Sequence, residues 1–447
     1  MARRLRALPA IVLAAAIFAP SRPSIHAQTA AISQEELQYV AVLSRHGVRA
    51  PTNTPEDLQD YAPQPWPMWD AATAYLTPRG NKLMQLLGVY YRQYLVRAGL
   101  LTTPGCADLR RVYFWADTVG RDIESAWALG RAMMPGCDVT IHRLAESNPD
   151  PLFAPRAAGV GKFDFAAARE AYLAKVGRSP EAVLDSYRTD FEAVEEILFG
   201  CKASPTCPPA GVEVKKRIPK QPALALPENG LPASPAINAA HAVAEAILLE
   251  YLNGVEEKQI GWGRVDAAKR DELLKFEGRY WDSVTSLYAS KAAASNLLSH
   301  LLRSLEQAVS GSAVSGAIGN PGDKALFLLG HDGDIKRIAV MLGLSWGLEK
   351  RSRTNEVPPG ASLMLELWRD RTSGKRTVRI YLQTQTFEQI RRLTPLSLTT
   401  PPTRVPLVLS ACAAEAGGAH CGWEQFRAGV TAAIDPAFVQ PTAASGR

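Results

Sequence analysis

The sequence has few cysteines, little net charge and no long hydrophobic run beyond its first residues. Six cysteines in 447 residues are too few for a disulfide-rich miniprotein. A hydrophobic content of 47% excludes a disordered or collagen-like chain. No later stretch reaches membrane-spanning length without a charge or a proline. The composition therefore predicts a soluble globular protein, long enough for two or three domains.

The chain also lacks an excess of charge of one sign. It has 50 basic and 44 acidic residues, but four of the basic ones lie in an N-terminal segment that we expect to be removed: Arg3, Arg4, Arg6 and Arg22. Without them, 46 basic residues face 44 acidic ones. This balance gives no electrostatic reason to expect a nucleic acid or a membrane as a partner.

The N-terminal segment has the pattern of a secretory signal peptide. Three arginines precede the apolar run Ala10–Ala19, and small residues follow at Ile25–Ala27. A membrane anchor is the alternative, but the run is about half of the roughly 20 residues that a spanning helix needs. We therefore expect residues 1–27 to be cleaved after Ala27, and the protein to be periplasmic or secreted.

Export favours the oxidation of cysteines to disulfides. The six cysteines fall into three pairs of sequence neighbours, which are Cys106 with Cys137, Cys201 with Cys207, and Cys412 with Cys421. This is one of many connectivities that six cysteines allow. A metal site is the competing interpretation, but the sequence has no C-x-x-C pair and no histidine at zinc-finger spacing. We therefore expect structural disulfides and no zinc.

Three segments repeat the pattern of a buried strand, a polar loop and a helix. The predicted strands are Leu37–Leu43, Arg111–Trp115 and Lys324–Leu329, and the predicted helices that follow them are Pro78–Arg97, Arg121–Met134 and Ile335–Leu342. Two further strands are expected at Ser362–Trp368 and Thr377–Gln383. The alternation predicts an α/β fold with a mainly parallel sheet and helices on both of its faces.

The composition between residues 148 and 288 changes to Ala, Glu, Leu and Lys at helical spacing. Within it, Pro205–Pro235 holds eight prolines and predicts an irregular loop. We expect residues 32–147 and 289–435 to form a discontinuous α/β domain that carries the site. Residues 148–288 are then an inserted helical domain, and residues 436–447 a flexible tail.

Charged residues gather directly after the predicted strands. They are Arg45, His46 and Arg49 after the first strand, Arg121 at the start of the second helix, and His331 with Asp332 after the third strand. Residues beyond the carboxyl ends of strands converge in an open α/β sheet. Three guanidinium groups around one point need a multiply charged anion, and phosphate fits them best. The predicted ligand is therefore a phosphoryl group.

The chemistry of this cluster requires a nucleophile and a proton donor. No cysteine lies near these loops and no serine elbow is visible, so His46 is the expected nucleophile. Neighbouring arginines should lower its pKa and keep the imidazole neutral. Asp332 is the expected general acid, and His331 a hydrogen-bond donor to the phosphoryl oxygens.

These motifs resemble those of the histidine acid phosphatases, branch 2 of the histidine phosphatase superfamily. Arg45–Thr52 is similar to the RHGxRxP signature of that family, and Gly330–Asp332 to its HD signature. Leu76–Gly80, Gly261–Arg264 and Pro358–Ala361 also resemble segments of exported bacterial phytases and glucose-1-phosphatases. The resemblance spans about Gln38 to Cys421.

The resemblance implies an α/β fold like that of the phosphoglycerate mutases, with a smaller helical domain over the cleft. It implies no metal or cofactor, and a small phosphomonoester as the substrate. The implied roles agree with those argued from the residues: His46 accepts the phosphoryl group, Asp332 donates the proton, and Arg45, Arg49, Arg121 and His331 bind phosphate. A phosphoglycerate mutase-like transferase and a non-catalytic phosphate or sugar-phosphate binding protein are the rival interpretations.

Two positions depart from the family pattern. Gly333–Asp334 replaces the common Thr-Asn, and we expect the Asp334 carboxylate to cap the following helix. Asn53 stands where the similar phytases commonly have a lysine, which weakens the case for phytate. Trp66 and Trp69 either line the substrate or attach their loop to the core.

Overall fold

The computed structural model describes residues 34–441, except 103–104, 178, 203, 205, 219–233, 349–354 and 414–419. The expected signal peptide, residues 1–27, lies outside the described residues, as does much of the proline-rich segment Pro205–Pro235. From Glu35 onward the described chain groups into one unit by its contacts.

The sheet has the strand order β2-β3-β1-β4-β5-β6, with β7 paired to β5. The strands are β1 (Glu35–Arg45), β2 (Val112–Ala116), β3 (Ala325–Gly330), β4 (Ser362–Asp370), β5 (Arg376–Thr384), β6 (Thr403–Leu407) and β7 (Cys421–Gly422). β1 and β2 pair with β3 in parallel, and the other pairs are antiparallel. The α/β class is confirmed, but the sheet is mixed, because the strands from β4 onward pair without crossover helices.

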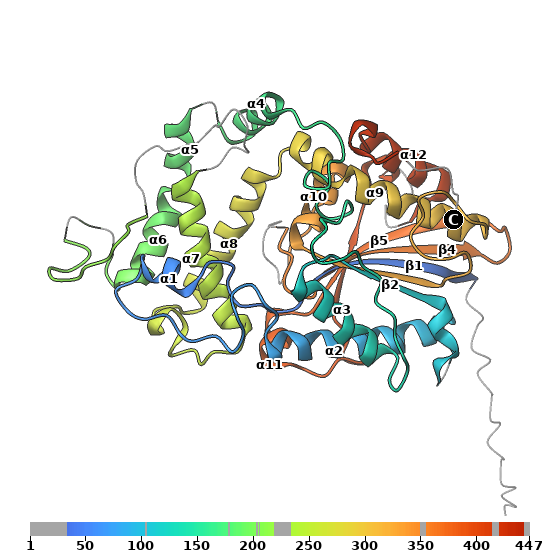
Figure 1. The fold of residues 1–447 in the computed structure, drawn as a ribbon, viewed down its shortest axis with the longest axis horizontal. Coiled ribbons are helices and arrows are strands. Elements are labelled where there is room, and N and C mark those ends of the chain that lie inside the picture. Colours follow the sequence, from blue (N-terminus) through green and yellow to red (C-terminus); the bar gives the residue numbers. More distant parts are fainter. Residues whose placement is uncertain are drawn as a thin grey trace, which may run out of the picture. The chain divides into compact units, whose positions relative to one another are not determined.

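Helices cover both faces of this sheet, as the sequence predicted (Figure 1). One face carries α2 (Pro78–Arg97) and α3 (Gly120–Met133), and the other carries α9 (Leu287–Ser310), α10 (Asp332–Leu342) and α12 (Trp423–Ala433). Alternate residues of β1 point to opposite faces of the sheet. Ala41 and Leu43 lie in the cluster formed with α9 and α10, whereas Val40 and Val42 lie in the cluster formed with α2 and α3. The core therefore has two layers around one sheet.

A third hydrophobic cluster is built mainly from helices between α3 and α9. The helices of that stretch are α4 (Phe165–Val176), α5 (Pro180–Ser186), α6 (Arg188–Phe199), α7 (Pro235–Leu252) and α8 (Ala267–Val284). Phe191, Ile247 and Phe276 lie in this cluster, which also takes in Trp66 and Phe387 from outside the stretch. The division into two domains remains a prediction, because the cluster draws on both of the expected parts.

The long loop that follows β1 is attached to this helical cluster. It contains the short helix α1 (Pro55–Gln59). Trp66 is 9% exposed, and its ring meets that of Trp262 edge-on at 4.9 Å between centroids. Trp69, which is partly buried, packs against the same cluster. Of the two interpretations of these tryptophans, the structure favours attachment of the loop to the core.

Short polar caps begin the helices that lead into the site. The Thr77 hydroxyl accepts a hydrogen bond from the Gly80 amide at 2.9 Å, and Pro78 follows at the first helical position. At α10, the amide of His331 donates to the Asp334 carboxylate at 2.9 Å. The expected capping role of Asp334 is therefore confirmed.

The remaining elements are short. They are α11 (Phe387–Arg392) and the 3₁₀ helices η1 (Cys106–Arg111), η2 (Ile260–Gly263), η3 (Ser410–Cys412) and η4 (Pro436–Phe438). Phe438 is buried and meets the ring of Tyr288, so the first residues of the expected flexible tail pack against the protein. Residues 442–447 lie outside the described part.

Disulfides join Cys106 to Cys137, Cys201 to Cys207, and Cys412 to Cys421, the pairing expected from sequence neighbours. Such bonds persist in oxidising compartments and therefore fit an exported protein. In the described part of the chain, no helix is both long enough and apolar enough to cross a membrane.

Candidate active site

Three neighbouring parallel strands end at the same edge of the sheet and deliver polar residues there. Arg45 lies opposite Gly330 in the register of β1 and β3. Just beyond the strands, the amide of His46 donates to the Gly330 carbonyl at 3.0 Å, and the amide of Asp117 donates to the Leu329 carbonyl at 2.9 Å. The sheet edge thus places side chains from distant parts of the sequence beside one another, as the strand-end rule predicts.

The backbone after His46 is held against the start of α2. The Thr77 amide donates to the Val48 carbonyl at 2.9 Å. A Cβ atom at Gly47 would lie 2.5 Å from the Gly80 carbonyl oxygen, closer than such atoms can approach. Glycine at position 47 is required by this contact between backbones. The turn that carries His46 therefore has little freedom to move.

The imidazole of His46 is buried, with 2% of the residue exposed. Its Nδ1 lies 2.8 Å from the carbonyl oxygen of Gly47, so this nitrogen carries the proton and donates it to the carbonyl. The lone pair is then on Nε2. The ring lies edge-on to that of His331, at 5.7 Å between centroids. Local backbone geometry thus selects the nitrogen that can act as a nucleophile.

The electrostatic surroundings keep His46 neutral. Burial lowers its pKa most, and the positive charges of Arg45, Arg121, His331 and Arg49 lower it further, to well below the usual value. The direction agrees with the sequence prediction, although burial outweighs any single arginine. His46 therefore keeps its lone pair in mildly acidic solution.

The three predicted arginines converge around His46 and are each held from one side. Arg45 Nη1 donates to the Val357 carbonyl at 2.5 Å. Arg49 Nη2 pairs with Glu245 at 2.5 Å. Arg121 Nη1 donates to the Ala74 carbonyl at 3.4 Å. The Nε atoms of all three arginines have no hydrogen-bond partner within the described residues. Each arginine thus has at least one donor that the described residues do not use.

Two acidic residues that the sequence analysis did not select hold His331. Asp117 Oδ2 lies 2.9 Å from Nε2 of the imidazole, and Asp122 Oδ2 lies 3.7 Å from its Nδ1. Burial alone would lower the pKa of His331, but the Asp122 and Asp117 carboxylates outweigh burial and raise the pKa to about 9. His331 is therefore a cation near neutral pH.

We expect Asp117→Asn to lower the pKa of His331, because the amide removes one of the negative charges that raise it. The titration of the His331 imidazole by ¹⁵N NMR measures this, with the signal assigned from a His331→Asn sample. The predicted order is a pKa of about 9 in the wild-type protein and a lower value in the variant. The exposed Asp266→Asn is the control and should leave the titration of His331 unchanged. An unchanged pKa of His331 in Asp117→Asn would contradict the role of Asp117 in raising it.

One group in the described part of the chain has ligand atoms spaced for a metal ion. It consists of Asp117, Asp122 and His331, whose ligand atoms lie within 4.8 Å of one another. A protonated imidazole has no lone pair to offer a metal, and the arginine cluster repels a further cation. We therefore interpret the group as a histidine cation that is ion-paired to two carboxylates.

Asp332 lies at the first position of α10, beside Arg45. Its Oδ2 is 3.3 Å from Arg45 Nη2, and 9% of the residue is exposed. Burial would raise the pKa of the carboxyl group, but Arg45 and Lys336 outweigh burial and hold the pKa below its usual value. All six predicted site residues therefore lie in one cluster, to which Glu245 of α7 also belongs.

Sequence reasoning could have found some of the missed residues but not all. Asp117 directly follows β2, so the same strand-end rule selects it. Asp122 is the neighbour of Arg121 in the sequence, but only the structure shows that it is buried. Its carboxylate oxygens have no hydrogen-bond partner within the described residues. Glu245 lies in the middle of α7, far from any strand end, and carries no comparable signal.

The chain is similar to known proteins over most of its length. A phytase from Escherichia coli K12, AppA, is 30% identical over 418 residues, which span 90% of this chain and 93% of the relative. A glucose-1-phosphatase from Providencia rettgeri is 27% identical, over 95% of this chain and 98% of the relative. The solved apo structure of the Hafnia alvei phytase superposes with a TM-score of 0.80 at 30% identity, covering 92% of this chain and all of that one.

The match to the family extends over most of the sequence. Residues 36–383 fit the family model of the histidine phosphatase superfamily, branch 2. This range includes both signature segments and every residue of the cluster. The chain therefore belongs to branch 2 of the histidine phosphatase superfamily and is a phosphomonoester hydrolase of that type.

Proposed function

We propose that the protein hydrolyses phosphomonoesters by transferring the phosphoryl group first to His46 and then to water. The observation that carries the proposal is the buried His46 ring, whose Nδ1–H is held by the Gly47 carbonyl while four cationic groups surround it. Nε2 attacks phosphorus and the ester P–O bond breaks as Asp332 protonates the departing oxygen. Water then attacks the phosphohistidine, Asp332 takes up its proton, and phosphate leaves.

The cationic side chains supply the electrostatic part of this reaction. Arg45, Arg49, Arg121 and His331 neutralise the phosphoryl oxygens and stabilise the charge that shifts onto them in the transition state. The low pKa of Asp332 in the free protein comes from positive neighbours. A bound phosphate dianion offsets those charges and raises the pKa, so Asp332 becomes protonated when a substrate occupies the site.

We infer that the substrate is phytate or a sugar phosphate. Relatives named as phytases and glucose-1-phosphatases support this range. A Hafnia alvei phytase solved with myo-inositol hexakis sulphate superposes with a TM-score of 0.78. Asn53 is exposed on its loop and adds no positive charge, so we expect monophosphates to be used at least as well as phytate. The disulfides and the predicted signal peptide support action in the periplasm or outside the cell.

The test is phosphate release by the mature protein in excess chelator at about pH 5. We expect release from p-nitrophenyl phosphate, glucose 1-phosphate and phytate, without inhibition by the chelator. A non-catalytic binding protein would release none, and a mutase-like transferase would move the phosphoryl group onto a second substrate molecule. Inhibition by the chelator would contradict metal-free chemistry.

A further inference from the structure

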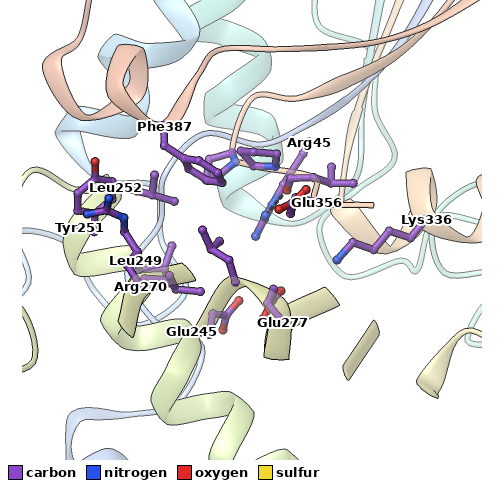
Figure 2. A pocket seen from close by; sticks show the side chains of 15 residues that line it. Arg45, Glu245, Leu249, Tyr251, Leu252, Arg270, Glu277, Lys336, Glu356 and Phe387 are labelled. Atoms are coloured by element: carbon purple, nitrogen blue, oxygen red, sulfur yellow. Dashed lines mark hydrogen bonds between the residues drawn. The ribbon is translucent and has the colours of Figure 1, made fainter. Parts of the chain in front are cut away.

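A pocket lies beside the cluster, between the sheet edge and the helices α7 and α8 (Figure 2). Its lining includes Arg45 and Lys336 on one side, Glu245 and Glu277 on another, and Leu249 and Phe387. Arg45 belongs both to this pocket and to the proposed phosphate site. The pocket therefore adjoins the place where the ester is cleaved.

Lys336 is an unusual residue for the interior of this protein. Only 6% of it is exposed, and Figure 2 shows the end of its side chain turned toward the other lining residues. Within the described residues, its Nζ makes no hydrogen bond or ion pair, and it lies over the face of the Trp281 ring, 4.3 Å from the centroid. The ammonium group lines the pocket, so its N–H donors can pair with a ligand there.

The nearby carboxylates already have partners of their own. Glu245 pairs with Arg49 at 2.5 Å. Glu277 accepts a hydrogen bond from the Trp281 indole at 2.9 Å and pairs with His241 at 2.6 Å. These acids lower the cost of burying Lys336 by their charge, but they leave its three N–H donors unused.

The position of Lys336 follows from the helix that carries it. Asp332 and Lys336 are four residues apart in α10, and side chains at this spacing lie on the same face of a helix, about 6 Å apart. In the proposed reaction, Asp332 meets the ester oxygen of the leaving group. The next few atoms of the leaving group can then reach Lys336 through the pocket.

We propose that Lys336 binds a second anionic group on the leaving group of the substrate, a few bonds from the ester oxygen. The inference rests on the proposed function. The remaining wall is mixed: it includes leucine side chains from α7, the carboxylates of Glu245 and Glu277, and the guanidinium group of Arg270. Between two phosphomonoesters of the same size, the one with an additional acidic group near the ester oxygen is therefore favoured.

Two substrates with the same carbon skeleton test this proposal. In 2-phosphoglycerate a carboxylate replaces one hydroxymethyl group of glycerol 2-phosphate. We expect Lys336→Met to lower the ratio of their kcat/KM values, acid over alcohol, by about 10-fold, the size expected for one charge-assisted hydrogen bond. Any effect of Lys336 on Asp332 changes both rates alike and cancels in the ratio.

Two further variants complete the experiment. Lys336→Arg keeps the positive charge and should change the ratio less than about 3-fold, while the exposed Lys258→Met should leave it unchanged. Thermal unfolding checks that each variant folds, and Lys336→Gln replaces Lys336→Met if the latter does not. An unchanged ratio in the uncharged variant overturns the proposal, even if both rates fall. Failure of the wild-type protein to hydrolyse either ester would instead overturn the proposed function.

Discussion

Replacing His46 with alanine should lower kcat for p-nitrophenyl phosphate by at least about 10⁴-fold, because the phosphoryl group then has no acceptor in the site. The surrounding cations should still bind the phosphate, so affinity for inorganic phosphate should fall much less than turnover. Steady-state release of p-nitrophenolate measures the first effect, and competition by phosphate for a labelled anion measures the second. The combination separates loss of the nucleophile from loss of the binding site.

A covalent intermediate gives the same prediction a second readout. The wild-type protein, mixed with substrate and quenched in base, should carry one phosphoryl group that is stable in base and labile in acid, as expected for a phosphohistidine. His46→Ala should not be labelled. His142→Ala is the matched control, since His142 stacks on Tyr113 at 4.1 Å and has no contact with the cluster in the described residues. Labelling of the His46 variant would contradict the mechanism.

Asp332→Asn should produce a loss that depends on the leaving group. Glycerol 2-phosphate releases an alkoxide that needs a proton in the transition state, so its kcat/KM should fall by about 10³-fold. p-Nitrophenolate is stable without a proton, and kcat/KM for its ester should fall less than about 10-fold. The amide of asparagine is nearly the same shape as the carboxyl group, which keeps the change local.

The two steps of the reaction can also be separated in the Asp332→Asn protein. Asp332 is the proposed base for attack by water, so dephosphorylation should become slow. Rapid mixing with p-nitrophenyl phosphate should then give a burst of p-nitrophenolate close to one per site, followed by a slow phase. Asp334→Asn is the control, because Asp334 caps the same helix through the His331 amide. In the leaving-group comparison, an equal fall in kcat/KM for glycerol 2-phosphate and p-nitrophenyl phosphate would show that Asp332 is not the proton donor.

Strand-end positions explain why the site could be predicted without the structure. β1, β2 and β3 are short buried strands with a clear pattern, and each is followed by charge. In parallel pairing, the ends of such strands share one edge, so His46 and His331 meet although 285 residues separate them. The capping signals at Thr77 and Asp334 are local and were equally readable.

Other features depend on contacts that leave no local pattern. The direction of β4 to β7 follows from their pairing in the finished sheet, and a strand sequence does not encode it. Whether Trp66 lines the substrate or attaches its loop to the core depended on whether a partner such as Trp262 packs against it. The pairing of Glu245 with Arg49 requires α7 to lie against the sheet edge, and helical periodicity does not specify that packing.

The sequence by itself determined the α/β class and the family, and it predicted which residues gather at the strand ends, because these follow from short-range patterns and from one topological rule. Only the tertiary structure decided the ionisation of these residues and the surroundings of the leaving group. Burial and the distances between charges set the pKa values of His46 and His331, and both quantities exist only in the folded chain. Lys336 is an ordinary helical lysine in the sequence, and it becomes a candidate ligand because folding buries it beside Arg45 and Asp332.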